Sequence, residues 1–243
     1  IPTHNSYMAS GGIIAHEFLF NGVKSYDIDH PELQEKTTTS ITVGAGDTKY
    51  SNKLLSKFKV GYDILSQQGL EFNGKFYPHP FIQRYTGSLN SGKEIIAEYV
   101  KKKAGSWTTV GTKSTISHVA YKINEFAAQG GRNPVMVKEE IGMFENLDKA
   151  READKETMMN GTYKFGSCFY LGTGGDMEKG TLAAYRMFYD PETYDLLPFN
   201  DRWEGKGKIG MFISATKRAM EYKDEQGNTK EAEATQYNLD ERA

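Results

Sequence analysis

The residues best suited to chemistry are two adjacent acids, Glu139 and Glu140, which follow the short apolar run 135–137. That run is Val-Met-Val and comes directly after Asn133 and Pro134, so the pattern predicts a buried strand that ends at the acids. Acids at the carboxyl end of such a strand face the crevice in which open α/β sheets bind ligands. One carboxylate can hold Mg²⁺ while its neighbour polarises a water molecule against a phosphate. A Glu-Glu pair after a strand is also a common start of a solvated helix, and this alternative stays open.

The elements that must position these acids follow an alternating order along the chain. Short runs rich in β-branched and aromatic residues predict strands, and longer stretches with helical spacing of apolar residues predict helices. The predicted strands cover 41–47, 106–121, 135–137, 164–172 and 208–214, and the predicted helices cover 6–20, 48–65, 93–103, 145–159 and 181–189. Because strands alternate with helices, the expected fold is α/β, with a mainly parallel sheet flanked by helices.

These predicted elements differ in how regular their patterns are. Residues 106–121 predict either one bent strand or a hairpin around Gly111, and residues 66–92 contain prolines and glycines that indicate irregular structure. The helix predicted at 48–65 has the most regular apolar stripe. We expect the members of this stripe in the core: Tyr50, Leu54, Leu55, Phe58 and Tyr62.

Composition narrows the class of protein. The chain has 243 residues, a length that suits one large α/β domain or one domain with an appendage. A net charge of -2 gives no global nucleic-acid footprint, so any DNA contact must be a local patch. The single cysteine, Cys168, excludes an internal disulfide framework and suits a reducing compartment. No apolar run approaches the length of a membrane span, no signal peptide is visible, and the start at Ile1 indicates a processed or cut chain.

Three motifs occur in an order found in phosphate-handling motor ATPases. Ser6 opens a predicted helix, the acid pair follows a strand, and Gly172-Thr173-Gly174 ends the next strand. In such machines a glycine-rich loop holds phosphates at a helix amino terminus, where backbone N–H groups and the helix dipole favour anions. A Ser or Thr hydroxyl of that loop contacts Mg²⁺, and a small polar strand end senses the γ-phosphate.

The sequence resembles the ATPase region of the large terminase subunit of tailed bacteriophages, the motor that packages DNA into proheads. The stretches that carry the resemblance are Ser6-Tyr-Met-Ala-Ser-Gly, Pro134-Val-Met-Val-Lys-Glu-Glu-Ile-Gly-Met-Phe-Glu-Asn-Leu147, Tyr170-Leu-Gly-Thr-Gly-Gly-Asp-Met-Glu-Lys-Gly-Thr181, Met187-Phe-Tyr-Asp-Pro191 and Leu197-Pro-Phe199. The resemblance covers nearly the whole chain from Ser6. It implies a P-loop NTPase-like fold that lacks its first strand and most of its phosphate loop.

The resemblance also implies roles for individual residues. Glu139 would coordinate Mg²⁺, and Glu140 would be the catalytic glutamate that orients the attacking water. Thr173 would lie in the motif that couples hydrolysis to motion. Ser6 would supply the phosphate-loop hydroxyl to nucleotide and metal, with Tyr7 beside it in the nucleotide-binding segment. At position 138 the family has an apolar residue, so Lys138 is expected to face out at the strand end or to lie beyond a shorter strand.

The activity implied by the resemblance is Mg²⁺-dependent ATP hydrolysis that drives double-stranded DNA into proheads. Residues 6–215 would form a partial ATPase domain and 216–243 a charged linker toward an absent nuclease domain. The implied partners are double-stranded DNA, the portal protein, the small terminase subunit and other copies of the chain in a ring, at the portal in the bacterial host cytoplasm and away from any membrane. A helicase-like ATPase and a non-catalytic fragment with a nucleic-acid-binding or structural role are the alternatives.

The first residues have a further resemblance, to the carboxyl end of an intein. Family members read Gly-Lys-Ser-Tyr where this chain reads His4-Asn5-Ser6-Tyr7, and an intein ends in His-Asn followed by Ser, Thr or Cys. In that chemistry the Ser hydroxyl receives the upstream segment, the His assists proton transfer and the Asn amide cyclises. Residues 1–5 would then be an intein remnant. Alternatively, a gene fragment begins here with five arbitrary residues.

Other polar residues have weaker patterns. Arg132, after two glycines, could reach a phosphate but is more typical of a surface loop, and His118 is typical of a strand histidine. Lys101-Lys102-Lys103 predicts a solvated face, with a DNA contact as the alternative. No His/Cys cluster has metal-ligand spacing.

Overall fold

The fold is described from a computed structural model. It describes residues 8–20, 39–68, 70–72, 74–77, 94–110, 113–122, 124–129, 131–172, 182–201, 205 and 207–211. The chain divides into two compact units, Pro2–Ala184 and Tyr185–Ala243, the latter including Ile1.

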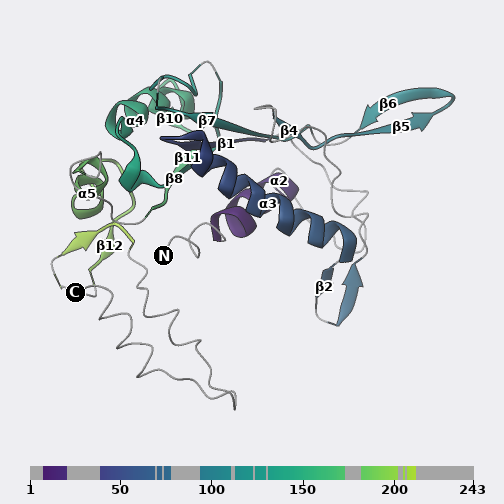
Figure 1. Ribbon diagram of the computed structural model, residues 1–243, viewed down its shortest axis with the longest axis horizontal. Helices are drawn as coiled ribbons and strands as arrows, with labels where there is room; N and C mark the ends of the chain where they lie inside the picture. Colours follow the sequence, from purple (N-terminus) through teal and green to yellow (C-terminus); the bar gives the residue numbers. More distant parts are fainter. Residues whose placement is uncertain are drawn as a thin grey trace, which may run out of the picture. The chain divides into compact units, whose positions relative to one another are not determined.

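A five-stranded sheet forms the centre of the first unit (Figure 1). Its strands, in order across the sheet, are β11 (Ser167–Tyr170), β8 (Val135–Glu139), β1 (Ser40–Ala45), β7 (Thr115–Ala120) and β4 (Ile95–Ile96). The first four are parallel to their neighbours, and only β4 is antiparallel to β7. The prediction of an α/β fold with a mainly parallel sheet is therefore confirmed.

Helices cover one face of the sheet. They are η1 (Met8–Ile14), a π-helical segment, α2 (Ala15–Phe20) and α3 (Thr48–Gln68), so the predicted helices at 6–20 and 48–65 are confirmed over their described parts. Phe18, Phe58 and Tyr62 form an aromatic group with ring centroids 5.6–6.1 Å apart. In the described part of the chain, no helix is both long enough and apolar enough to span a bilayer.

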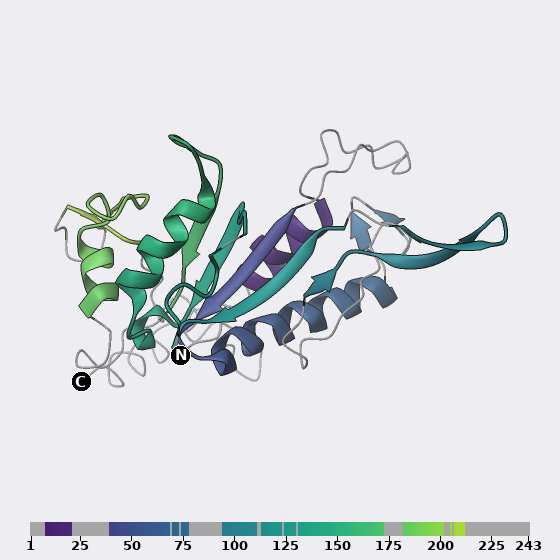
Figure 2. The ribbon, with the colours of Figure 1, turned by 90° about the horizontal axis from the view of Figure 1, so that it is seen from above.

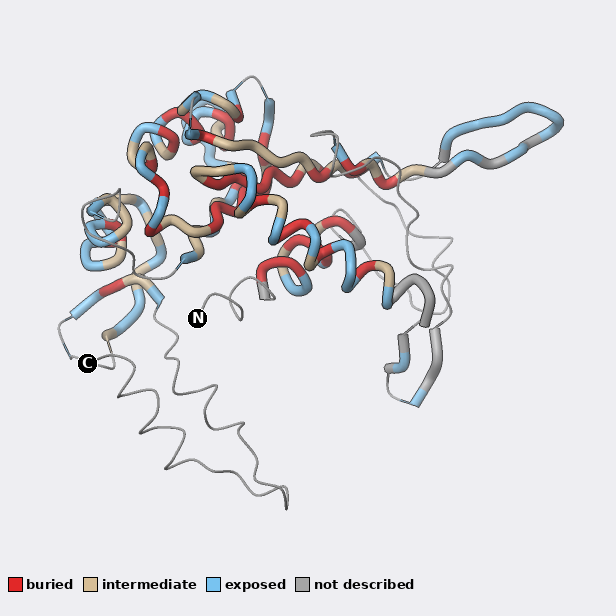
Figure 3. The backbone as a smooth tube through the Cα atoms, viewed as in Figure 1, coloured by how far each residue is buried: buried red, intermediate tan, exposed pale blue. Residues whose placement is uncertain are grey.

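The core residues on this face are at most 7% exposed. Figure 3 shows buried residues along β1, β8 and α3. Of the predicted stripe, Leu54, Leu55, Phe58 and Tyr62 are buried, while Tyr50 is half-buried. The members of the core are Ala9, Ile14, Ala15, Phe18, Ile41, Val43, Leu54, Leu55, Phe58, Tyr62, Ile95, Ala97, Ile116, Val135 and Val137.

The opposite face carries shorter helices. These are η5 (Ile141–Met143), α4 (Leu147–Lys155) and η6 (Glu156–Met158). Thr157 of η6 donates its hydroxyl to Asp154 O at 2.8 Å, and its oxygen lies 3.8 Å from Met136 Sδ of β8, so this segment packs against the strand. The predicted helix at 145–159 is therefore confirmed in its centre, but its last residue belongs to β9 (Met159–Asn160), which pairs with β10 (Tyr163–Lys164).

The helix predicted at 93–103 is wrong. This segment forms β4 and then β5 (Tyr99–Lys103), which pairs with β6 (Ser106–Val110) through a turn at Ala104 and Gly105. Ile95 and Ile96 pair with β7, so packing of β-branched side chains outweighs the helical preference of the lysines. Of the two alternatives for 106–121, the hairpin around Gly111 is wrong, because β6 pairs with β5 and β7 pairs with β1 and β4. A smaller hairpin joins β2 (Leu70–Phe72) and β3 (Lys75–Tyr77).

The predicted strand at 164–172 is shorter and less buried than expected. β11 covers Ser167–Tyr170, and Phe169 is 38% exposed. Among the described residues, β11 pairs only with β8 and forms the edge of the sheet, which explains its exposed side chains.

The second unit contains most of α5 (Leu182–Tyr189), which confirms the predicted helix at 181–189. β12 (Phe199–Asn200) pairs with β13 (Lys208–Ile209), and Gly210 N–H donates to Phe188 O at 2.6 Å. The strand predicted at 208–214 is described only at its start, and the predicted linker 216–243 lies outside the described residues.

Candidate functional site

The acid pair lies at the carboxyl end of β8, between two parallel neighbours. Glu139 is the last residue of the strand and pairs in register with Ala45 of β1. Lys138 pairs with Tyr170 of β11 on the other side. Glu139 is only 7% exposed and Glu140 is half-buried. The sequence therefore placed the acids correctly, and the strand is longer than the run from which it was predicted.

The backbone turns sharply at Glu140. This residue has φ 53° and ψ 50°, the left-handed region that non-glycine residues rarely adopt. Backbone bonds hold the turn: Leu171 N–H donates to Lys138 O at 2.8 Å, and Ile141 N–H donates to Leu171 O at 3.0 Å. A strained residue that its surroundings hold in place is a frequent feature of functional sites. The turn thus gives Glu140 a defined position at the strand end.

Gly172 packs against this turn from the end of β11. A Cβ added at Gly172 would lie 2.8 Å from Ile141 N and 3.1 Å from Ile141 Cγ1. Only glycine fits this approach without displacing the backbone. The first residue of the Gly172-Thr173-Gly174 motif therefore lies next to the acid pair. Thr173 lies outside the described residues.

Gly172→Ala should lower the free energy of unfolding by about 1–3 kcal/mol, because the new methyl group must displace the backbone of the acid turn. Urea unfolding of the full chain measures the change. Gly61→Ala is the matched control, since Gly61 lies in α3 with nothing within 4 Å of its added Cβ. That control should gain about 0.5–1 kcal/mol from helix propensity. Equal stability of the two variants would show that Gly172 is not sterically required.

Glu139 faces the side of the sheet on which η1 and α3 pack. Side chains alternate along a strand, so Glu139 shares this face with Val135 and Val137, which belong to the core there. Figure 2 shows η1 and α2 running in the same direction as α3, which begins three residues after β1 ends. η1 therefore begins toward the edge where β1 and β8 end. Ser6 and Tyr7 precede η1 in the sequence and lie outside the described residues, as do His4 and Asn5.

Lys138 faces the opposite side and is fully buried, so the expectation that it faces out, or that the strand is shorter, is wrong. Its Nζ lies 2.6 Å from Asp154 Oδ2 of α4, and both side chains are 0% exposed. Three aromatic rings surround the ammonium group at 4.9–5.8 Å from their centroids. We call this group the Lys138 cluster; its members are Lys138, Asp154, Tyr121, Phe144 and Tyr170.

Burial and charge shift the acidity of the groups in and beside the Lys138 cluster. Tyr121 donates its hydroxyl to Asp154 Oδ2 at 2.6 Å, and burial together with the Asp154 charge raises the pKa of Tyr121. Burial, followed by the neighbouring Cys168 thiol, raises the pKa of Tyr170. Burial also raises the pKa of Cys168 to about 11, so its thiol stays protonated near neutral pH. These groups are structural neighbours of the site on the far face of β8.

A cavity of about 130 Å³, which we call the Asp47 cavity, opens at the carboxyl end of β1, and no pattern in the sequence indicated it. Asp47 accepts a hydrogen bond from the Lys49 backbone N–H at 2.9 Å at the start of α3, and this bond lowers the pKa of Asp47. Lys122 Nζ lies 3.8 Å from Asp47 Oδ2. The cavity is lined by Gly46, Asp47, Lys49, Tyr50, Tyr121, Lys122, Met143, Phe144, Glu145 and Asn146. Its position beside η5 places it close to the acid turn.

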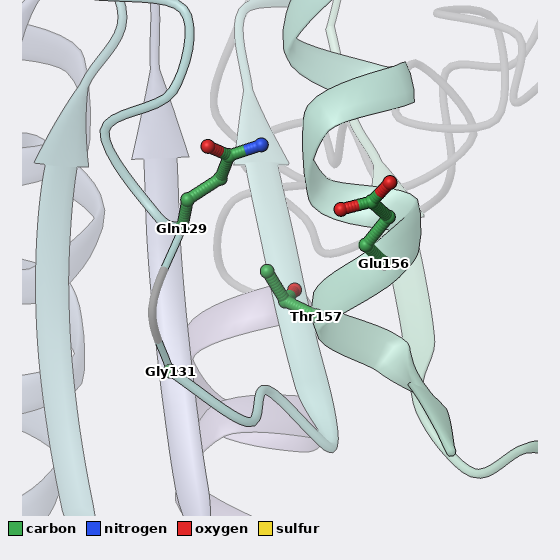
Figure 4. Close-up of a pocket in the computed structure, with 4 residues that line it drawn as sticks. All are labelled: Gln129, Gly131, Glu156 and Thr157. Atoms are coloured by element: carbon green, nitrogen blue, oxygen red, sulfur yellow. The ribbon is translucent and has the colours of Figure 1, made fainter. Parts of the chain in front are cut away.

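A second cavity, of about 250 Å³, lies away from the acids (Figure 4). Gln129, Gly131, Glu156 and Thr157 line it, and Asn133 N–H donates to Thr157 O at 3.1 Å where β8 begins. Arg132 is exposed beside this cavity, 6.0 Å from the Phe165 ring. Arg132 thus lies at the opposite end of β8 from the acid pair, which favours its surface-loop interpretation.

One other polar residue with a predicted role is His118. His118 is half-buried in β7 and contacts Ser51 Oγ at 3.4 Å, and burial lowers its pKa, as expected for a strand histidine. Within the described ranges, no group of three or more His, Cys, Asp or Glu side chains could hold a metal. Mg²⁺ is commonly held by one or two carboxylates together with waters and substrate phosphates, so the two glutamates fit that ion chemically.

The fold and site define an α/β domain with a mainly parallel sheet and an acid pair at the carboxyl end of a central strand. Comparison with models of known protein families finds no match. A search of curated proteins likewise finds no match to the sequence. The terminase resemblance therefore rests on the motifs quoted above, and its consequences are proposals.

Proposed function

We propose that this chain is the ATP-hydrolysing motor domain of a viral DNA-packaging terminase large subunit, with a P-loop NTPase-like fold. One observation carries the proposal. Glu139 and Glu140 end a buried central parallel strand, and Glu140 is held in a strained left-handed turn at the edge where α/β sheets bind ligands. A solvated helix start, the simpler interpretation of the acid pair, would leave Glu139 exposed, whereas it is buried.

The two acids would divide the work of hydrolysis. Glu139, buried and on the η1 face, would hold Mg²⁺ with the nucleotide phosphates. The Glu140 carboxylate would accept a hydrogen bond from the attacking water and orient it toward the γ-phosphorus. Catalysis of phosphoryl transfer consists mostly of such positioning and charge stabilisation. Ser6, Tyr7 and Thr173 would complete the nucleotide site, and their roles remain those implied by the resemblance.

The edge of the sheet provides a place for a further strand. Among the described residues β11 pairs only with β8, and its free side carries backbone groups able to pair. A parallel strand added there would end next to Gly172 and the acid turn. A phosphate-loop strand contributed upstream of Ser6 would therefore reach the acids without rearrangement of the sheet.

The test joins that upstream segment to this chain. The upstream coding sequence would be co-expressed with the chain, and intact mass would show whether a product ligated at Ser6 forms, as the His4-Asn5-Ser6 junction predicts. The ligated protein should hydrolyse ATP with Mg²⁺, and double-stranded DNA should stimulate it. Portal protein and the small terminase subunit would be its assembly partners. A ligated protein without ATPase activity would refute the motor proposal.

The chain alone should bind ATP only weakly. No glycine-rich loop with a lysine precedes Ser6 in the sequence, and that loop supplies most phosphate contacts in such sites. Isothermal titration with ATP and Mg²⁺ measures the affinity, and the ligated protein is the control. A dissociation constant in the low micromolar range for the chain alone would contradict this prediction.

A further inference from the structure

A two-stranded ribbon, the β5–β6 hairpin, extends from the end of the sheet near β4 and β7 (Figures 1 and 2). Its five residue pairs run from Tyr99↔Val110 to Lys103↔Ser106. Ala104 and Gly105 close it with φ of 49° and 86°, and positive φ at both turn residues matches the right-handed twist of paired strands. The hairpin is thus a regular, well-formed element.

The hairpin exposes side chains that proteins usually cover. Trp107 is 70% exposed and Val100 is 56% exposed. Figure 3 shows the projecting hairpin coloured mostly as exposed. Lys102 is opposite Trp107 in register, and its Nζ lies 6.0 Å from the Trp107 ring. Tryptophan is enriched at binding surfaces, where it often contributes much of the binding energy.

The charge of the hairpin is opposite to that of the chain. Residues 99–110 contain Lys101, Lys102 and Lys103 and no acid, while the whole chain has a net charge of -2. At the base of the hairpin, Lys113 pairs with Glu98 at 2.5 Å. The positive charge is therefore concentrated on the ribbon beyond that pair.

We infer that the β5–β6 hairpin is a docking arm for double-stranded DNA. Lysines neutralise backbone phosphates, and the B-DNA major groove is wide enough to admit a two-stranded ribbon. The deep, narrow major groove of duplex RNA is too narrow to admit such a ribbon. Lysines on edge strands also prevent aggregation, but that role does not account for an exposed Trp107 beside them.

A membrane surface fits the hairpin less well. Interfacial binding needs a broad apolar face in addition to basic residues. Among the hairpin residues whose exposure the structure describes, the large exposed apolar side chains are Trp107 and Val100, which is less than a broad apolar face. DNA binding by the hairpin requires neither ATP nor the acid pair, so failure of this proposal and failure of the motor proposal are separable.

The first experiment measures affinity of the full chain for a labelled DNA duplex of random sequence, by fluorescence anisotropy at several salt concentrations. The variant replaces Lys101, Lys102 and Lys103 with Gln. It should bind at least about tenfold more weakly, and the slope of log K against log salt should fall by about 2–3, since each phosphate contact contributes about 0.9. The matched control replaces three exposed lysines elsewhere with Gln: Lys53, Lys59 and Lys155.

The second experiment reports on the hairpin directly. The chain has two tryptophans, so Trp203→Phe leaves Trp107 as the sole indole fluorophore. DNA should change the emission of Trp107, and Trp107→Ala should weaken DNA binding several-fold while thermal unfolding stays unchanged. Unchanged Trp107 emission, equal losses in both triple-lysine variants, equal affinity for duplex RNA, or tighter binding to anionic phosphatidylserine vesicles would each overturn the proposal.

Discussion

Asp154→Ala should lower the free energy of unfolding by about 3–5 kcal/mol, because it leaves the Lys138 ammonium buried without its counter-charge. The Tyr121 hydroxyl bonds the same Asp154 oxygen, but it is neutral and cannot replace the lost negative charge. The Lys138 cluster surrounds the ammonium with the rings of Tyr121, Phe144 and Tyr170, which attract a cation but do not accept strong hydrogen bonds. The Tyr121 hydroxyl also loses its acceptor.

Chemical denaturation of the full chain measures this loss. Lys149→Ala is the matched control on the same helix, since Lys149 is exposed and lies 3.8 Å from Glu125. That surface pair should be worth less than about 1 kcal/mol. A double variant, Lys138→Met with Asp154→Leu, should recover part of this loss, because packed apolar groups can often replace a buried ion pair, while the buried Tyr121 hydroxyl still lacks its acceptor. A loss in Asp154→Ala no larger than in the control would show that Lys138 is neutral or solvated.

The sequence predicted the fold where patterns are local. The apolar spacing along α3 and the run that ends at Glu139 were sufficient to place a helix and a buried strand. The helix prediction for 93–103 was wrong because the lysines of this segment favour a helix locally. The strand forms because Ile95 pairs with Ile116, a contact between residues far apart in the sequence. The prediction that Lys138 faces out was wrong for a similar reason, since its buried partner Asp154 lies on α4.

The candidate site was predictable in its residue types but not in its geometry. Adjacent acids after an apolar run are visible in the sequence, while the left-handed backbone of Glu140 is not, because glycine is the usual residue there. The close approach of Gly172 depends on the register between β11 and β8. The Asp47 cavity depends on three segments that meet only in the folded chain.

Glu140→Gln in the ligated protein should reduce ATP hydrolysis by about 10²–10⁴-fold while ATP remains bound. Glutamine keeps the size of the side chain but cannot accept a proton from the attacking water. Phosphate release under DNA-stimulated conditions measures the turnover, and nucleotide titration measures the affinity. Glu145→Gln, at an exposed acid on the rim of the Asp47 cavity, is the control and should retain turnover.

Glu140→Gly separates the backbone role of this position from its chemistry. Glycine adopts φ near 53° without strain, so this variant of the full chain should gain about 1 kcal/mol in the free energy of unfolding. In the ligated protein it should lose hydrolysis as fully as Glu140→Gln. Glu140 would then reduce the stability of the fold while being required for the reaction. This is the pattern expected of a stability–activity trade-off. Retained turnover in either variant would remove Glu140 from catalysis and leave the turn as a structural feature of the strand end.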